Sequence, residues 1–254
     1  MSALRSAIGA EWTKLWTTRT VWWALTAAAL LMGAGAGQYA IYADNGDLGA
    51  ELVRTDGLVS AGTIAVLAVG LAQFALIALA MLVMTSEYST GTIRATLAWM
   101  PSRGRLLLAK GTVVAAVTIV AGTVLGIVGA VVAAPLLGDG GDVRVAPIVG
   151  DAVAIGGYLA LIAVFATGLG AALRGPVVTL VAIFLLVVLF PPVLVLPDLT
   201  VLNRLADALP GVAGNHFLRG DTDPYPPAVG LLIVAAWAVA ALLAGWVAMR
   251  RRDA

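Results

Sequence analysis

Six stretches of this sequence, each more than 20 residues long, contain no Asp, Glu, Lys, Arg or His. An α-helix needs about 20 mostly apolar residues to cross the hydrocarbon core of a bilayer. The whole chain is 61% hydrophobic and 11% charged, whereas soluble domains carry roughly 25% charged residues. We therefore predict an all-α integral membrane protein in which residues 1–254 form a single transmembrane domain. The six spans are expected at about 20–42, 59–84, 111–137, 152–172, 176–196 and 228–249.

Residues 1–19, which precede the first span, have the pattern of an amphipathic helix. Such a helix lies in the membrane interface, with its tryptophans at headgroup depth. Glu11 lies at the edge of the apolar stripe. It can pair with Lys14, three residues further on, or contact the basic loop between the second and third spans, and both interpretations stay open at this point. The apolar stripe consists of Leu4, Ile8, Trp12, Leu15 and Trp16.

The fifth stretch contains two consecutive prolines. Its uninterrupted part, residues 177–190, is short for a membrane crossing. Pro191 and Pro192 are expected to kink or end the helix, because proline lacks the backbone donor and clashes with the preceding turn. We therefore expect a broken or re-entrant region before the sixth span. Within residues 197–227, a leucine edge predicts a short helix at the interface; it is formed by Leu199, Leu202, Leu205 and Leu209.

The basic residues predict the orientation, because Lys and Arg are enriched in cytoplasmic loops. If the N-terminus is cytoplasmic, 11 of the 15 bases fall on the cytoplasmic side and four fall outside. Six spans also place both termini on the same side. We therefore expect a multi-pass protein of the cell inner or plasma membrane with both termini cytoplasmic. The four outer bases are Arg54, Arg144, Arg204 and Arg219.

The sequence lacks the residue patterns of the common catalytic sites. A Walker A loop needs Gly directly before its Lys, but Lys14 follows Thr13 and Lys110 follows Ala109. The chain has no cysteine and a single histidine, His216, which excludes paired-histidine and cysteine metal motifs within it. We expect no catalytic, cofactor or metal site on this chain, no enzymatic activity and no nucleic-acid partner.

The segment 85–110, between the second and third spans, combines polar residues with clustered positive charge. Its middle has apolar residues at helical spacing, namely Ile93, Leu97 and Met100, and the run Pro101–Gly104 is expected to end that helix. We predict a short cytoplasmic helix here. The charged residues of the segment are Glu87, Arg94, Arg103, Arg105 and Lys110.

Two polar side chains lie inside the apolar stretches. Gln73 is in the second span and Tyr158 is near the start of the fourth. Either can line a transport path, and either can instead join two helices by a hydrogen bond. The glycine pairs Gly33/Gly37 and Gly122/Gly126 match the GxxxG pattern of closely packed membrane helices, which is a weak signal in a chain with 29 glycines.

Three segments carry a resemblance to a known family. They are EWTKLWTTRTVWW before and into the first span, SEYSTGTIRATL at the end of the second, and PSRGRLLLAK at the start of the third. Together with the order of the elements, they resemble the permease subunit of type-2 ABC exporters in its compact six-span bacterial form. The most specific part is Glu-x-x-x-Gly-Thr-Ile-Arg, from Glu87 to Arg94.

The resemblance implies a mechanism and a set of partners. Two permeases pair, with a homodimer favoured over a heterodimer, and two separate ATPase subunits bind ATP and Mg²⁺ beneath them. The helix between spans two and three would be the coupling helix, Glu87 to Trp99, and the N-terminal helix would be the connecting helix. The implied coupling residues are Glu87, Gly91, Ile93, Arg94 and Leu97, and those of the connecting helix are Glu11, Trp12 and Lys14.

The charge-free spans favour an apolar or amphiphilic cargo for such an exporter. Two other classes of protein stay open. A non-transporting membrane scaffold or sensor subunit could use the same loop to bind an ATPase. A membrane-embedded enzyme acting on lipids is the third class, but it would need clustered acids or histidines near a membrane face, and the sequence offers none.

Overall fold

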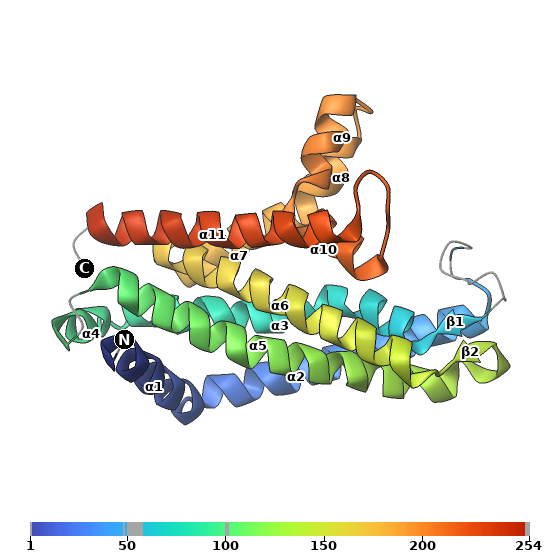
Figure 1. Cartoon of the computed structure of the whole chain (residues 1–254), viewed down its shortest axis with the longest axis horizontal. Helices are drawn as coiled ribbons and strands as arrows, with labels where there is room; N and C mark the ends of the chain where they lie inside the picture. The colour runs from blue at the N-terminus through green and yellow to red at the C-terminus, as the bar shows by residue number, and fades with distance from the viewer. Residues whose placement is uncertain (1, 48, 50–57, 100–101, 252–254) are drawn as a thin grey trace. The chain divides into compact units, whose positions relative to one another are not determined.

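The computed structural model describes residues 2–47, 49, 58–99 and 102–251, and these residues are almost entirely helical (Figure 1). In chain order, the elements are α1 (Ser2–Thr17), α2 (Arg19–Asp44), β1 (Val59–Ser60), α3 (Ala61–Ser89), α4 (Ile93–Trp99), α5 (Arg103–Ala133), two 3₁₀ turns (Ala134–Leu136 and Gly138–Gly140), β2 (Gly141–Asp142), α6 (Val145–Leu173), α7 (Pro176–Phe184), a π-helical turn (Leu185–Leu189), α8 (Phe190–Val195), α9 (Thr200–Asp207), α10 (Pro210–Arg219) and α11 (Pro227–Arg251).

The prediction of six apolar helices is confirmed. Six helical segments of the described chain are long and apolar enough to cross a membrane, which makes this a multi-pass membrane protein by length and composition. Several extend beyond the charge-free stretches, because the backbone hydrogen bonds of a helix do not require apolar side chains. The six segments are Arg19–Asp44, Ala61–Ser89, Arg103–Leu136, Val145–Leu173, Pro176–Val195 and Pro227–Arg251.

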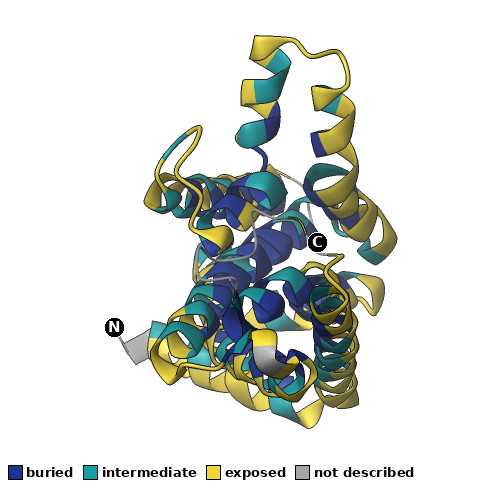
Figure 2. Ribbon diagram, turned by 90° about the vertical axis from the view of Figure 1, so that its right-hand side faces the viewer, coloured by how far each residue is buried: buried dark blue, intermediate teal, exposed yellow. Residues whose placement is uncertain are grey.

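The chain divides into two compact units. The first unit comprises residues 1–21, 77–117 and 160–254, and the second comprises residues 22–76 and 118–159. Within each unit, buried residues lie on the sides of helices that face other helices, and exposed residues lie on the outer sides (Figure 2). The prediction of a single transmembrane domain stays a prediction.

In the first unit, α6 and α11 approach each other through glycine. A Cβ on Gly168 would lie 2.5 Å from the carbonyl carbon of Ala241, and a Cβ on Gly245 would lie 2.7 Å from the carbonyl oxygen of Gly168. No other residue type fits such backbone contacts, and small residues are the usual means of close packing between membrane helices.

Of the two outcomes expected at Pro191 and Pro192, a kinked or an ended helix, the structure has the interrupted but continuing helix Pro176–Val195. The interruption comes one turn earlier, as the π-helical turn Leu185–Leu189, and both prolines lie in α8. Proline is tolerated in the first turn of a helix, where its missing N–H has no intrahelical partner to lose. The π-helical turn is packed against α10, where Gly211 leaves room for the backbone of Val187.

Two short helices, rather than one, occupy the segment before α11. Of the leucine edge, Leu202 and Leu205 lie in α9, and Leu199 and Leu209 are the N-cap residues of α9 and α10. The helix α9 packs on α8, and α10 packs on α11. In Figure 1, α8 leaves the direction of α7 and α9 lies beside it. Whether this region is re-entrant stays a prediction.

In the second unit, the GxxxG pair of α5 makes a close helix contact. A Cβ on Gly122 would lie 2.9 Å from the Cα of Gly156 in α6, and one on Gly126 would lie 2.7 Å from the Cα of Ala152. Gly33, in contrast, has open space where a Cβ would be.

The strands β1 and β2 form a two-residue parallel pair in the same unit.

Candidate functional site

A group of four charged side chains, three of them buried, lies in the first unit. We call it the ionic cluster; its members are Glu11 and Lys14 of α1, Glu87 of α3 and Lys110 of α5. The Lys110 ammonium donates to Glu11 Oε2 at 2.7 Å, to Glu87 Oε1 at 2.5 Å and to the carbonyl oxygen of Val83 at 3.2 Å. Lys14 donates to the same oxygen of Glu87. The cluster therefore joins three helices.

Local sequence explains how these side chains meet. Glu11 and Lys14 are three residues apart on α1, so they project from the same face of that helix. Glu87 is in the last turn of α3, and Lys110 is two turns into α5. A helical connection through α4 brings these two helix ends together (Figure 1).

The pairing explains how charged side chains can be buried inside the protein. The side chains of Lys110 and Glu87 are 0% and 2% exposed. An isolated buried charge is very unfavourable, and it is retained in a protein only when it is paired and hydrogen-bonded. Two lysines and two glutamates balance each other here. One acceptor is left over, because Glu87 Oε2 is buried and has no hydrogen-bond partner among the described residues.

The structure distinguishes between the two interpretations of Glu11. Its carboxylate contacts Lys110, the last residue of the predicted basic loop. Lys14, the alternative partner, donates to Glu87 instead. Trp12 is on the same helix, is partly exposed and makes an edge contact with Trp16 at 5.8 Å between ring centroids.

The short predicted helix is present as α4, but its apolar side faces inward. Ile93 is 3% exposed and belongs to the core of the first unit, and Leu97 packs against that core. Ile93 and Leu97, two of the implied coupling residues, therefore attach α4 to its own chain. Met100 and Pro101 lie outside the described residues. The core residues around Ile93 and Leu97 are Met84, Leu106, Leu107, Ala171 and Met249.

The outward face of α4 is formed by other residues. Arg94 and Ala98 are exposed, and Trp99 is 92% exposed. Gly91 lies in the turn before the helix with a φ of +73°, a left-handed conformation that glycine adopts without strain. The sequence pattern did not single out the side chain of Trp99, although aromatic residues are enriched in protein interfaces.

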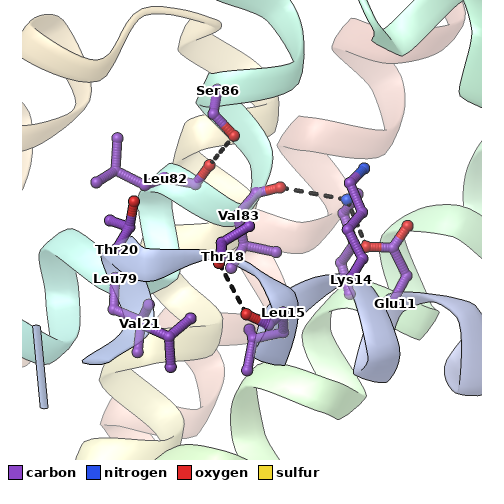
Figure 3. A pocket seen from close by; sticks show the side chains of 11 residues that line it. Glu11, Lys14, Leu15, Thr18, Thr20, Val21, Leu79, Leu82, Val83 and Ser86 are labelled. Carbon is purple, nitrogen blue, oxygen red and sulfur yellow. Dashed lines mark hydrogen bonds and ion pairs between the residues drawn. The ribbon is translucent and has the colours of Figure 1, made fainter. Parts of the chain in front are cut away.

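A cavity of about 190 Å³ lies beside the ionic cluster. Figure 3 shows apolar side chains, including Leu79 and Val21, on one side and the charged side chains of Lys14 and Glu11 on the other. The remaining lining residues are Leu15, Thr18, Thr20, Leu82, Val83, Ser86 and Lys110.

Two arginines hold the last turn of α11, which sequence reasoning did not anticipate. Arg103 donates to the carbonyl oxygen of Met249, and Arg174 donates to that of Ala248 at 3.3 Å. Cations are favourable at the negative end of a helix dipole. The Arg174 guanidinium also lies 5.0 Å from the centre of the Tyr88 ring. These contacts connect α5 and the α6–α7 turn to the end of α11.

Gln73 and Tyr158 form a pair inside the second unit. The Tyr158 hydroxyl donates to Gln73 Oε1 at 2.6 Å, and the Gln73 amide donates to the carbonyl oxygen of Gly70 at 2.9 Å. Both side chains are buried. The geometry is that of an interhelical hydrogen bond between α3 and α6.

The single histidine is part of a structural contact in the first unit. His216 Nε2 lies 2.6 Å from the carbonyl oxygen of Tyr225, and the Tyr225 hydroxyl donates to the carbonyl oxygen of Asp207 at 2.6 Å. Burial raises the pKa of the Tyr225 hydroxyl, and the charge of Asp207 raises it further. These bonds hold the segment between α10 and α11 against α9.

A search against protein-family models and a search of curated proteins each found no match for this sequence.

Proposed function

We propose that this chain is the membrane-spanning permease subunit of an ABC exporter. It would pair with a second copy of itself in the cell inner or plasma membrane, with both termini cytoplasmic. Two separate ATPase subunits would supply ATP hydrolysis, and the pair of permeases would form the path for an apolar or amphiphilic cargo. The proposal rests on the resemblance in the three sequence segments and on the geometry around α4.

The observation that carries the proposal is that α4 is packed against its own chain on one side and exposed on the other. A coupling helix must be rigidly attached to its own spans and must present a surface to a partner. Ile93 and Leu97 supply the attachment, since they pack on the core formed by α3, α5, α6 and α11. Trp99 and Arg94 supply an exposed surface. Aromatic residues and arginine are the residue types most enriched among the strong contacts of protein interfaces.

The ionic cluster supports the same proposal. It ties α1 to the ends of α3 and α5, the two helices that α4 connects. A force applied to α4 would therefore reach α1, the proposed connecting helix, through the ionic cluster. Its charged groups resist separation because separation would leave a buried charge unpaired. Glu11, Lys14 and Glu87 have this linking role in the proposal.

The test is binding of the partner ATPase by the purified permease. Trp99→Ala is expected to weaken binding by about 2 kcal/mol or more, roughly a 30-fold increase in Kd, because truncating a central aromatic contact has effects of this size. Trp23→Ala is the matched control, since Trp23 is also exposed but lies outside the α4 region. If the Trp99→Ala variant and the wild type bind the ATPase equally well, α4 is not part of the docking surface.

A second measurement separates an exporter from a scaffold or sensor subunit. The complex is reconstituted in vesicles, and movement of an amphiphilic fluorescent cargo is followed with and without ATP. An exporter moves the cargo only with ATP. A complex that binds the ATPase through α4 and moves no cargo would favour the scaffold or sensor class.

A further inference from the structure

We propose that the cavity beside the ionic cluster is a binding site for a phospholipid of the surrounding membrane with a negatively charged head. One acyl chain would occupy the apolar part, and the head would lie against Lys14 and Arg19. The inference rests on the cavity alone and does not depend on the transport proposal. Its partner is a lipid recognised by an anionic group joined to an apolar chain.

The walls of the cavity favour an apolar chain. Leu15 and Val21 come from the α1–α2 junction, and Leu79, Leu82 and Val83 come from α3. Water in such a space would find few hydrogen-bond partners along these walls, and ordered buried water needs about two to four of them. The cavity is partly open to the outside, so a longer chain can enter it and continue into the bilayer.

Hydrogen-bond accounting identifies the kind of head group. Lys110 uses all three of its N–H donors on Glu11, Glu87 and Val83. Lys14 is different, because its one hydrogen bond to a described residue goes to Glu87 and its side chain is 46% exposed. Because Lys14 lines the cavity, its other two N–H groups can donate to the acceptor oxygens of a head group there.

The entrance of the cavity carries a second positive charge. Arg19 is exposed and lies in the chain between two lining residues, Thr18 and Thr20. The acids of the ionic cluster are buried and already accept hydrogen bonds from lysine. A phosphate diester with no compensating positive charge therefore matches the exposed bases better than a zwitterionic head does.

The tryptophans near the cavity in the sequence indicate how deep the site lies in the membrane. Trp12 and Trp16 are on α1, and Trp22 and Trp23 directly follow the lining residue Val21 in the chain. Tryptophan concentrates at the boundary between head groups and hydrocarbon. A cavity with a basic entrance and apolar walls at this boundary has the polarity of a phospholipid.

The experiment measures lipid binding to the full chain in detergent by native mass spectrometry. The probes are palmitoyl-oleoyl phosphatidylglycerol, phosphatidylcholine with the same chains, and glycerol phosphate without chains. Phosphatidylglycerol is expected to bind about tenfold more tightly than phosphatidylcholine, the difference expected for one hydrogen bond to a charged group. Equal binding of the two lipids, or equally tight binding of glycerol phosphate, would overturn the proposal.

Variants test the two ends of the site separately. Lys14→Met and Arg19→Gln should reduce the preference for phosphatidylglycerol, while Lys14→Arg should retain it. Val83→Phe should weaken binding of both lipids by filling the apolar part, and it keeps the test decisive if Lys14→Met does not yield a monodisperse protein. The matched controls are the exposed residues in Arg5→Gln and Val177→Phe, and both should bind as the wild type does. Unchanged binding by Val83→Phe would place the lipid elsewhere.

Discussion

At the scale of single residues, Lys110 is the centre of the ionic cluster. Its side chain is fully buried, and it is the one described residue that contacts both Glu11 and Glu87. Removing one partner from a buried ion pair is far more harmful than replacing the whole group, because the remaining charges lose their compensation. This asymmetry gives a direct test of the role of the cluster.

We expect Lys110→Met to destabilise the protein by about 3–5 kcal/mol, since the buried carboxylate of Glu11 loses its lysine partner and that of Glu87 keeps only Lys14. Thermal unfolding in detergent measures the effect. Arg105→Met is the control, because Arg105 is an exposed base on the same helix. Adding Glu11→Gln and Glu87→Gln to Lys110→Met should recover part of the loss. Equal melting temperatures for the Lys110 and Arg105 single variants would contradict the buried cluster.

The sequence could predict which charges matter here, but not how they pair. Glu87 and Lys110 stand out because they border apolar stretches, and Glu11 stands out on the edge of an apolar stripe. Their pairing depends on how α1, α3 and α5 are rotated about their axes, which helical periodicity within one segment does not specify. Glu11 had two plausible partners for this reason.

At the scale of helices, close packing depends on individual glycines. Gly156 and Gly157 are neighbours on α6, but they differ completely in their surroundings. A Cβ on Gly156 would lie 2.6 Å from the carbonyl oxygen of Ile119 on α5, whereas a Cβ on Gly157 would meet nothing within 4 Å. The pair separates the effect of helix packing from that of helix propensity.

We expect Gly156→Ala to destabilise the protein by about 1–3 kcal/mol, the usual effect of overpacking. Gly157→Ala should be neutral or stabilising by up to about 1 kcal/mol, because alanine favours the helix. Both variants are compared with the wild type by thermal unfolding in the same detergent. A loss of stability in Gly157→Ala as large as that in Gly156→Ala would argue against the α5–α6 contact.

The fifth apolar helix shows where a sequence rule stops being informative. Two adjacent prolines correctly indicated an irregular helix, because their missing donors must be accommodated somewhere. The rule placed the irregularity in the preceding turn, where the structure has the π-helical turn Leu185–Leu189. It left open whether the helix would kink or end there, and the turn is packed against Gly211 of α10, which is a tertiary contact. The inward orientation of Ile93 on α4 was hidden from periodicity in the same way, because an apolar face does not state what it will contact.

At the scale of the whole molecule, the number of apolar helices was the most predictable feature. Bilayer thickness sets a minimum length for a span, and apolar composition shows directly in the sequence. The orientation across the membrane is a separate question. It rests on the distribution of basic residues, of which Arg54 and Arg252 lie outside the described part of the chain.

The positive-inside rule predicts that both termini face the cytoplasm. The chain contains no cysteine, so single cysteines can be introduced without a background signal. Cysteines at Asn45, Gly140 and Thr222 are expected to react with a membrane-impermeant thiol reagent in intact cells. Cysteines at Ser102 and Asp253 are expected to react only after the membrane is permeabilised. Each position is outside the six apolar segments, so labelling reports the side of the membrane rather than burial in lipid.

The pattern of labelling distinguishes two kinds of error. Complete reversal would mean that the six helices cross the membrane but that the 11 cytoplasmic bases are in fact outside. Reversal at both Thr222 and Asp253 would mean that the Pro176–Val195 segment does not cross, whereas reversal at Thr222 alone would mean that neither this segment nor α11 crosses. The π-helical turn in that segment makes Thr222 the most informative position. Labelling there in intact cells, together with protection at Asp253, requires the sixth helix to span the bilayer, and it requires the fifth helix to span if the fourth does.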